Sequence, residues 1–250
     1  MTMVTLSTRQ ETSLIKRTRP TSSKIIFISC EGQVTEEEYF EVISNLFAGI
    51  KSKIQFISVM SDVIKTSPES RTEEQISSLG KSQPWQLVEK IDTFKNEKSD
   101  IYDFLNHPED EFWIIADVDN HTNDDNIARW NQTISDCKNK NYGYAISNPF
   151  FELWLLLHHL DVNEDDYKYA VTEKHAYEKT SHYRNRLRDD AKSPLKESKH
   201  IESIHYDVEK VKGASKRAKA LHNNSEEWPH NLGSTMFLLV DKIIEIADSQ

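Results

Sequence analysis

Acidic residues occur at the points where two apolar segments of this sequence end. Glu31 comes directly after residues 25–30, and Asp117 and Asp119 come at the end of residues 112–116. Apolar runs of this length are typical of buried strands in a parallel sheet, and ligands bind such sheets outside the carboxyl ends of the strands. Carboxylates that converge there need a cation or a proton to offset their repulsion, and oxygen ligands favour Mg²⁺ or Mn²⁺ over zinc. The sequence therefore predicts a divalent-metal site with Glu31, Asp117 and Asp119 as ligands.

The aspartate pair at positions 117 and 119 also fits other uses. A calcium-binding loop starting at Asp117 would need glycine and glutamate where this sequence has Thr122 and Ala128, so that interpretation fails. Phosphatases with an aspartyl nucleophile and glycosyltransferases that bind manganese use two aspartates in a similar relation. Neither alternative explains Glu31, although a single glutamate after a strand can also be a surface residue or a helix cap.

Glu152 is a further candidate for the same edge. It lies one turn inside a helix that is predicted to start at Asn148, an N-cap residue, and Pro149. At this position Glu152 could be an additional metal ligand or a base that orients a reacting group. The aromatic and leucine residues around it predict core packing. His158 and His159 come two turns later, point away from the edge, and are predicted to have structural roles.

Strands and helices alternate along the chain up to about residue 160. Strands separated by helices predict right-handed crossovers and a parallel α/β sheet of about four strands flanked by helices. Thr35 with Glu38 three residues later predicts a capping box at the first helix. The predicted strands are residues 25–30, 54–59, 112–117 and 142–146, and the predicted helices are residues 35–48, 84–98, 124–139 and 149–159.

The 250 residues suit one large domain with an extension. We expect a disordered tail over 1–23, an α/β domain over 24–160 and a helical, charged extension over 161–250 that packs back on the domain. The net charge of −10 argues against indiscriminate nucleic-acid binding, but residues 167–220 hold fourteen Lys or Arg against eight Asp or Glu. This segment is either a solvated helical surface or a lobe that contacts phosphates.

Several classes of site and location are disfavoured by composition. The chain has six glycines and no glycine-rich phosphate loop, so any ATP is expected to be bound by another protein. Its two cysteines, Cys30 and Cys137, are too few for a disulfide framework or a cysteine-rich zinc site. No run of eighteen apolar residues and no signal-peptide pattern at the start is present, which predicts a cytoplasmic protein without a membrane partner.

These motifs, taken in order, resemble the RloB family over nearly the whole predicted ordered chain. The resemblance implies a Toprim-type fold, in which Glu31 corresponds to the Toprim glutamate and Asp117 and Asp119 to the aspartate pair; Glu152 matches a further motif residue. It also implies an AAA- or ABC-type ATPase partner and a role as a nuclease effector in restriction-linked antiphage defence, with transfer RNA among the possible substrates. The segments that carry the resemblance are residues 30–40, 117–119, 147–154, 214–221 and 234–240.

Two hypotheses about function follow. In the first, the chain is a metal-dependent nuclease that cleaves RNA or DNA with Mg²⁺ or Mn²⁺, and Lys216, Arg217 and Lys219 contact phosphates. The chain lacks room for a separate strand-passage domain, so hydrolysis is more economical than topoisomerase chemistry. In the second, it is a noncatalytic subunit that docks on an ATPase or a nucleic acid. Retention of all three Toprim-type carboxylates favours the first hypothesis.

Overall fold

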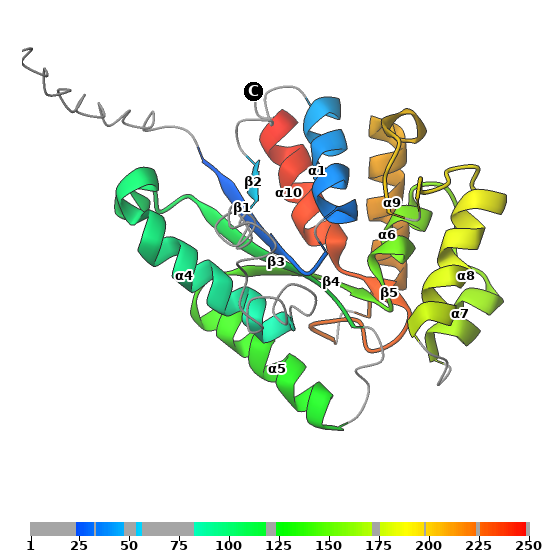
Figure 1. The fold of residues 1–250 in the computed structure, drawn as a ribbon, viewed down its shortest axis with the longest axis horizontal. Coiled ribbons are helices and arrows are strands. Elements are labelled where there is room, and N and C mark those ends of the chain that lie inside the picture. The colour runs from blue at the N-terminus through cyan, green and yellow to red at the C-terminus, as the bar shows by residue number, and fades with distance from the viewer. Residues whose placement is uncertain are drawn as a thin grey trace, which may run out of the picture.

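The protein is a parallel α/β sheet with helices on both faces, as predicted (Figure 1). The computed structural model describes residues 24–32, 34–47, 54–56, 83–118, 124–171, 176–197, 199–223 and 226–248. The predicted tail over residues 1–23 lies outside this part of the chain. The strands are β1 (Ile26–Cys30), β2 (Ile54–Phe56), β3 (Glu111–Asp117), β4 (Gly143–Asn148) and β5 (Gly233–Ser234).

The strand order is β2-β1-β3-β4-β5, in which β1 to β4 are parallel and the short β5 runs antiparallel to β4. The chain places β2 on one side of β1 and then crosses to place β3 on the other side. Such a reversal creates a crevice at the carboxyl ends of the two central strands, which is where open α/β sheets bind ligands. The ends of β1 and β3 are therefore the expected functional edge.

The two faces of the sheet are covered by different groups of helices. One face packs against α4 (Pro84–Tyr102) and α5 (Asp124–Asn139). The other face is covered by α1 (Thr35–Leu46), α6 (Phe151–Leu157), α9 (Val208–Leu221) and α10 (Met236–Asp248) (Figure 1).

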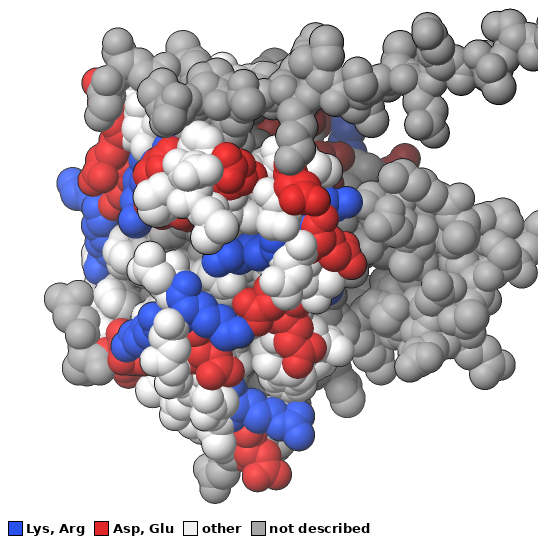
Figure 2. All heavy atoms as spheres, turned by 90° about the vertical axis from the view of Figure 1, so that its left-hand side faces the viewer, with Lys and Arg blue, Asp and Glu red and all other residues white. Residues whose placement is uncertain are grey.

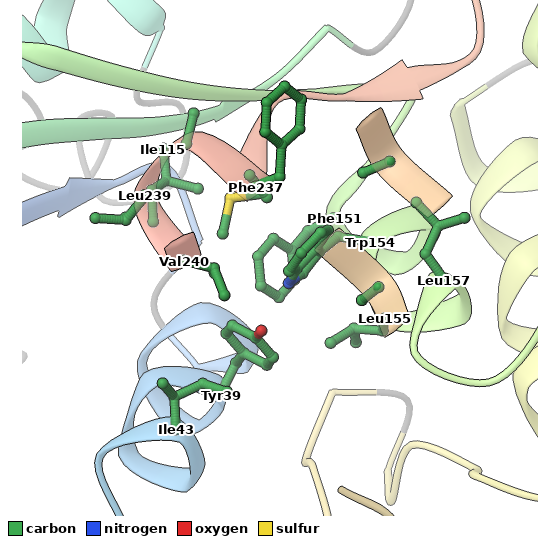
Figure 3. Packing of buried hydrophobic residues seen from close by; sticks show 14 of the residues in the cluster. Tyr39, Ile43, Ile115, Phe151, Trp154, Leu155, Leu157, Phe237, Leu239 and Val240 are labelled. Atoms are coloured by element: carbon green, nitrogen blue, oxygen red, sulfur yellow. The ribbon is translucent and has the colours of Figure 1, made fainter. Parts of the chain in front are cut away.

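Side chains alternate between these two faces along each central strand. In β1, Ile26 and Ile28 join the core under α1 and α6, whereas Phe27 joins the core under α4 and α5. Both faces need apolar side chains, so β1 is a continuous apolar run rather than an alternating one. In the larger core, Tyr39 of α1 and Trp154 of α6 lie beside residues of α10 (Figure 3).

The extension after residue 160 is helical and joins the sheet at its end. It contains α7 (Glu164–Val171), α8 (Ala176–Asp189) and α9, and short 3-10 turns occupy Phe104–Asn106 in the α/β part and Ser203–His205 in the extension. It then supplies β5, and α10 packs on β4 and α9. Among the described residues no helix has the length and apolar character that crossing a bilayer requires.

The two predicted helix caps are wrong. Val34 is the N-cap of α1, and the Thr35 hydroxyl donates instead to the Lys199 carbonyl at 2.8 Å. The carboxylate of Glu38 accepts the backbone N–H of Ile201 at 2.8 Å and lies 2.7 Å from a His200 ring nitrogen. These side chains bind the extension, a tertiary contact that outweighs local capping.

The predicted start of α6 at Asn148 and Pro149 is wrong for a similar reason. Asn148 is the last residue of β4, where it pairs with Gly233, and its side-chain amide donates to the Pro229 carbonyl at 2.9 Å. The peptide bond between Asn148 and Pro149 is cis, and Phe150 is the N-cap of α6. The helix therefore begins two residues later than predicted.

Candidate functional site

Glu31 and Asp117 meet at the carboxyl ends of β1 and β3. The backbone N–H of Glu31 donates to the Ile115 carbonyl at 3.1 Å, which continues the strand pairing one residue beyond β1. In return the backbone N–H of Asp117 donates a long hydrogen bond, 3.4 Å, to Oε2 of Glu31. The sheet thus places two of the predicted ligands next to each other at the crevice between its central strands.

Asp119 lies outside the described residues, so its place at this edge stays a prediction. Val118, the residue before it, is buried, and its N–H donates to the Ser147 carbonyl of β4 at 2.9 Å. Within the described part of the chain, no three His, Cys, Asp or Glu side chains are grouped closely enough to hold a metal ion. The predicted metal site therefore depends on Asp119 or on movement of neighbouring carboxylates.

Glu36 is a carboxylate of this edge that the sequence analysis did not identify. It is in the first turn of α1, only 7% exposed, and its carboxylate lies against Gly32, the residue after Glu31. A Cβ at Gly32 would collide with that carboxylate, so a larger residue there would require the Glu36 side chain to move. Burial raises the pKa of Glu36 to about 7, with smaller contributions from Glu152 and Glu37, while backbone N–H groups oppose the rise.

A sequence signal for Glu36 does exist. Glu36, Tyr39, Phe40 and Ile43 have the spacing of one helix face, and all of them are buried. An acidic residue in the core-facing position of an amphipathic helix is unusual and indicates a site. The run of three glutamates at 36–38 conceals this position, because acidic residues are also favoured in any first helical turn.

Glu152 is buried at the start of α6 and is held by Arg184 of α8. Nε of Arg184 donates to Oε1 of Glu152 at 2.8 Å, and a terminal guanidinium nitrogen lies 2.7 Å from the same oxygen. Glu152 is also within electrostatic reach of Glu36. Glu36 thus contacts Gly32 and interacts electrostatically with Glu152, and Glu152 in turn pairs with Arg184.

Lys90 of α4 brings positive charge to the other side of the edge. It interacts electrostatically with Cys30 and Glu31; burial lowers the pKa of Lys90, and these two groups oppose that change. The Cys30 thiol lies 2.9 Å from the Gly32 carbonyl, and burial first, then Glu36 and Glu37, raise its pKa well above the usual value. Cys30 is thus a neutral thiol near pH 7.

The three basic residues predicted to contact phosphates all lie on α9, and they differ in their surroundings. Arg217 donates from one terminal nitrogen to the Leu157 carbonyl at 2.8 Å, and its Nε pairs with Asp161 at 3.0 Å. Lys219 forms an ion pair with Asp241 of α10. Lys216 is exposed and makes no salt bridge within the described residues.

The basic residues of α9 and the carboxylate of Glu152 lie near opposite ends of α6. Leu157 ends α6, whereas Glu152 is near its start, and each helical residue adds about 1.5 Å. Lys216 and Arg217 line a cavity of about 390 Å³ beside Leu157 and Val162. Contacts from α9 would thus reach a substrate well away from the reacting phosphate.

His158 is structural, as predicted. Its Nδ1 lies 2.9 Å from the Trp154 carbonyl, which can only accept, so Nδ1 carries the proton and Nε2 accepts from the Tyr39 hydroxyl at 3.1 Å. Burial lowers the pKa of His158 to about 3 and that of His159 to about 4. Both rings are therefore neutral near pH 7.

The family model described as RloB-like protein matches residues 26–243, which is most of the chain. The match includes Glu31, Asp117, Asp119 and Glu152 and also the α9 segment. No curated protein and no solved structure matches this sequence.

Proposed function

Since the chain belongs to the RloB-like family, we propose that it is a metal-dependent nuclease that hydrolyses phosphodiester bonds of RNA or DNA. The observation that carries the proposal is the meeting of Glu31 and Asp117, joined by the hydrogen bond from the Asp117 N–H to the Glu31 carboxylate. These groups come from two central strands and converge at the crevice where parallel α/β sheets bind ligands. This convergence suits chemistry on a charged substrate.

The side chains at this edge fit a hard divalent cation. Glu31, Asp117 and Asp119 would be its ligands, and they offer only oxygen atoms, which suit Mg²⁺ or Mn²⁺. The pKa of Glu36 at this edge is raised first by burial and then, to a smaller extent, by the neighbouring carboxylates of Glu152 and Glu37. A bound Mg²⁺ or Mn²⁺ ion would supply Lewis acidity and an activated water for hydrolysis.

The chain's own residues would position the substrate and handle protons. Glu36 has a pKa of about 7, so its buried carboxyl can hold or release a proton near neutral pH. Glu152 is fixed in place by Arg184 and can orient a reacting group at the same edge. On α9, Lys216 is exposed and makes no salt bridge within the described residues, so it is the first of the three proposed phosphate contacts to test.

We propose that the biological setting is antiphage defence in the cytoplasm, together with an AAA- or ABC-type ATPase partner. The resemblance of the motifs to the RloB family supports this setting, and the lack of a glycine-rich phosphate loop in the sequence agrees with ATP being bound by another protein. Transfer RNA is the first RNA substrate to test.

The experiment that tests the nuclease proposal is cleavage of plasmid DNA, single-stranded DNA and bulk transfer RNA in Mg²⁺ or Mn²⁺. The control is the double variant in which both carboxylates are removed, Glu31→Ala, Asp117→Ala. Cleavage of one substrate class by the wild type and none by the variant is the expected result. Equal cleavage by both proteins would show a contaminating activity and remove the support for this site.

A noncatalytic docking subunit is the second candidate. Calorimetric titration with Mg²⁺ or Mn²⁺ separates the two candidates. Binding that Asp117→Asn abolishes supports the nuclease, whereas no binding at millimolar metal supports the docking subunit.

A further inference from the structure

We propose that Arg184 binds a phosphate group of the nucleic acid, and that through it the helical extension forms part of the site. This inference rests on the proposed function, because it names a substrate contact of the same site. The basic segment of the sequence suggested phosphate contacts in α9, whereas Arg184 of α8, in the same segment, forms a hydrogen bond to Glu152 at the carboxylate edge.

The orientation of the guanidinium leaves part of it available. Nε and one terminal nitrogen of Arg184 both contact a single oxygen, Oε1 of Glu152. The other terminal nitrogen forms no hydrogen bond within the described residues. The Arg184 side chain is 33% exposed while that of Glu152 is 9% exposed. One side of the planar group is therefore anchored to a buried carboxylate, and the rest is open to a ligand.

The backbone that carries Arg184 is firmly held. The neighbouring Tyr183 and Leu187, one helical turn apart, are fully buried in the main core. The Tyr183 hydroxyl donates to the Asp166 carbonyl at 3.1 Å, and Arg186 pairs with the buried carboxylate of Asp166. Because α8 and the Glu152 anchor are both fixed, a phosphate would meet a guanidinium that is already in place.

The charge of the edge explains why such a cation is needed. Glu31, Asp117, Glu36 and Glu152 gather there, and a phosphodiester would be repelled if no positive group faced it. A guanidinium suits this position because its planar set of donors can bind a carboxylate on one side and a phosphate on another. A bound metal ion would compensate only part of this acidic surface.

Nucleic-acid binding by catalytically inactive protein tests the inference. In an Asp117→Asn background, the affinities for fluorescent oligo(U) and oligo(dT) of equal length are measured over a range of salt concentrations. The variants are Arg184→Met and Arg188→Met. Arg188 lies one turn further along α8, is exposed, and pairs with its neighbour Asp189, so it is a matched control.

Loss of one phosphate contact should lower the slope of log affinity against log salt by about 0.7 on a single strand. We expect this change, with a several-fold weaker affinity at low salt, for Arg184→Met alone. An unchanged slope for Arg184→Met would overturn the inference, and so would equal changes for both variants, since those would indicate general surface charge.

A purely structural role of Arg184 predicts a different result. Removing it leaves Glu152 buried without its partner, which can unfold the protein. The double variant Glu152→Gln, Arg184→Met avoids the unpaired charge, and its salt slope is compared with that of Glu152→Gln alone. If the two slopes are equal, Arg184 only neutralises Glu152 and the inference fails.

Failure of the nuclease proposal can be distinguished from failure of the Arg184 inference. Cleavage is measured on the wild type and binding on the inactive protein, so each can fail alone. If the wild type cleaves nucleic acid but Arg184→Met does not change binding, the nuclease proposal is supported and the Arg184 contact is overturned. An Arg184 effect without any cleavage by the wild type would leave the contact and favour the docking subunit.

Discussion

The carboxylate edge and the basic surface of α9 differ in how their charges are arranged. At the edge, Glu31 and Asp117 come from strands far apart in sequence and are brought together by strand pairing, and Lys90 interacts electrostatically with Glu31. On α9, Arg217 and Lys219 are paired with acidic residues of neighbouring segments. Among the described residues the edge therefore gathers several carboxylates around Lys90 and Arg184, whereas Arg217 and Lys219 of the helix each have an acidic partner of their own.

This difference shows which sequence patterns are informative about function. Parallel strands deliver their carboxyl ends to one place, so acidic residues there must converge and their repulsion must be offset by a ligand or a proton. A run of basic residues on a helix points in several directions, and each residue can pair locally. The amino-terminal side of the sheet shows such mixing, since positive and negative groups interleave there among the visible described residues (Figure 2).

Replacing Glu36 should produce the largest stability effect. Its pKa rises from 4.5 to about 7. The folded state therefore binds the proton more tightly than the unfolded state, so this stabilisation is complete below pH 4.5 and is lost as pH rises through 7. Without metal, Glu36→Gln should therefore gain up to roughly 3 kcal/mol relative to wild type at pH 8, and much less at pH 5.

Thermal unfolding in a chelator at both pH values measures this difference. Glu41→Gln, an exposed residue of the same helix, is the control and should follow the wild type. A gain for Glu36→Gln that is no larger at pH 8 than at pH 5 would mean that the folded protein does not raise the pKa of Glu36, and the contrast with α9 would be lost.

Arg217→Met should destabilise the protein by about 1–2 kcal/mol, because the Leu157 carbonyl loses a charged donor and Asp161 loses its partner. Lys219→Met removes a more exposed ion pair and should cost less than about 0.5 kcal/mol. Urea unfolding of both variants gives the comparison. Equal losses of unfolding free energy would contradict the view that the contacts of Arg217 stabilise the fold more than the ion pair of Lys219.

Lys216→Ala should have the smallest effect, and only on binding. The side chain is exposed, so the free energy of unfolding should change by less than about 0.5 kcal/mol. The salt slope of single-stranded nucleic-acid binding should fall by about 0.7. If affinity and salt dependence are both untouched, Lys216 is part of a solvated surface and α9 contributes no phosphate contact.

The strands and helices of the α/β part could be predicted to within a few residues from the sequence. Burial on both faces gives β1 and β3 uninterrupted apolar runs, and α5 matches its predicted range of 124–139. Gly233 and Ser234 of β5 were missed, because two small residues carry no strand pattern.

The part of the candidate site that lies at the ends of the strands could be predicted from the sequence. The contacts between side chains of different helices could not. Glu31 and Asp117 converge because the carboxyl ends of adjacent parallel strands lie at one edge. Glu152 and Arg184 lie on different helices and are 32 positions apart in sequence. An ion pair between such residues leaves no periodic pattern in the sequence. The cap at Thr35 failed for the same reason, since its partner Lys199 is distant.

The complete burial of α6 has a consequence for the synthesis of this protein. All seven residues of α6 are buried, and their cover includes α9 and α10, which end at residues 221 and 248 (Figure 3). A nascent chain that stops near residue 160 has made every proposed metal ligand but exposes this apolar helix. The core can close only when α10 has been made and has left the ribosome. The proposed metal ligands therefore wait on an incomplete core until α10 is available, and products that stop before this helix are expected to aggregate or be degraded.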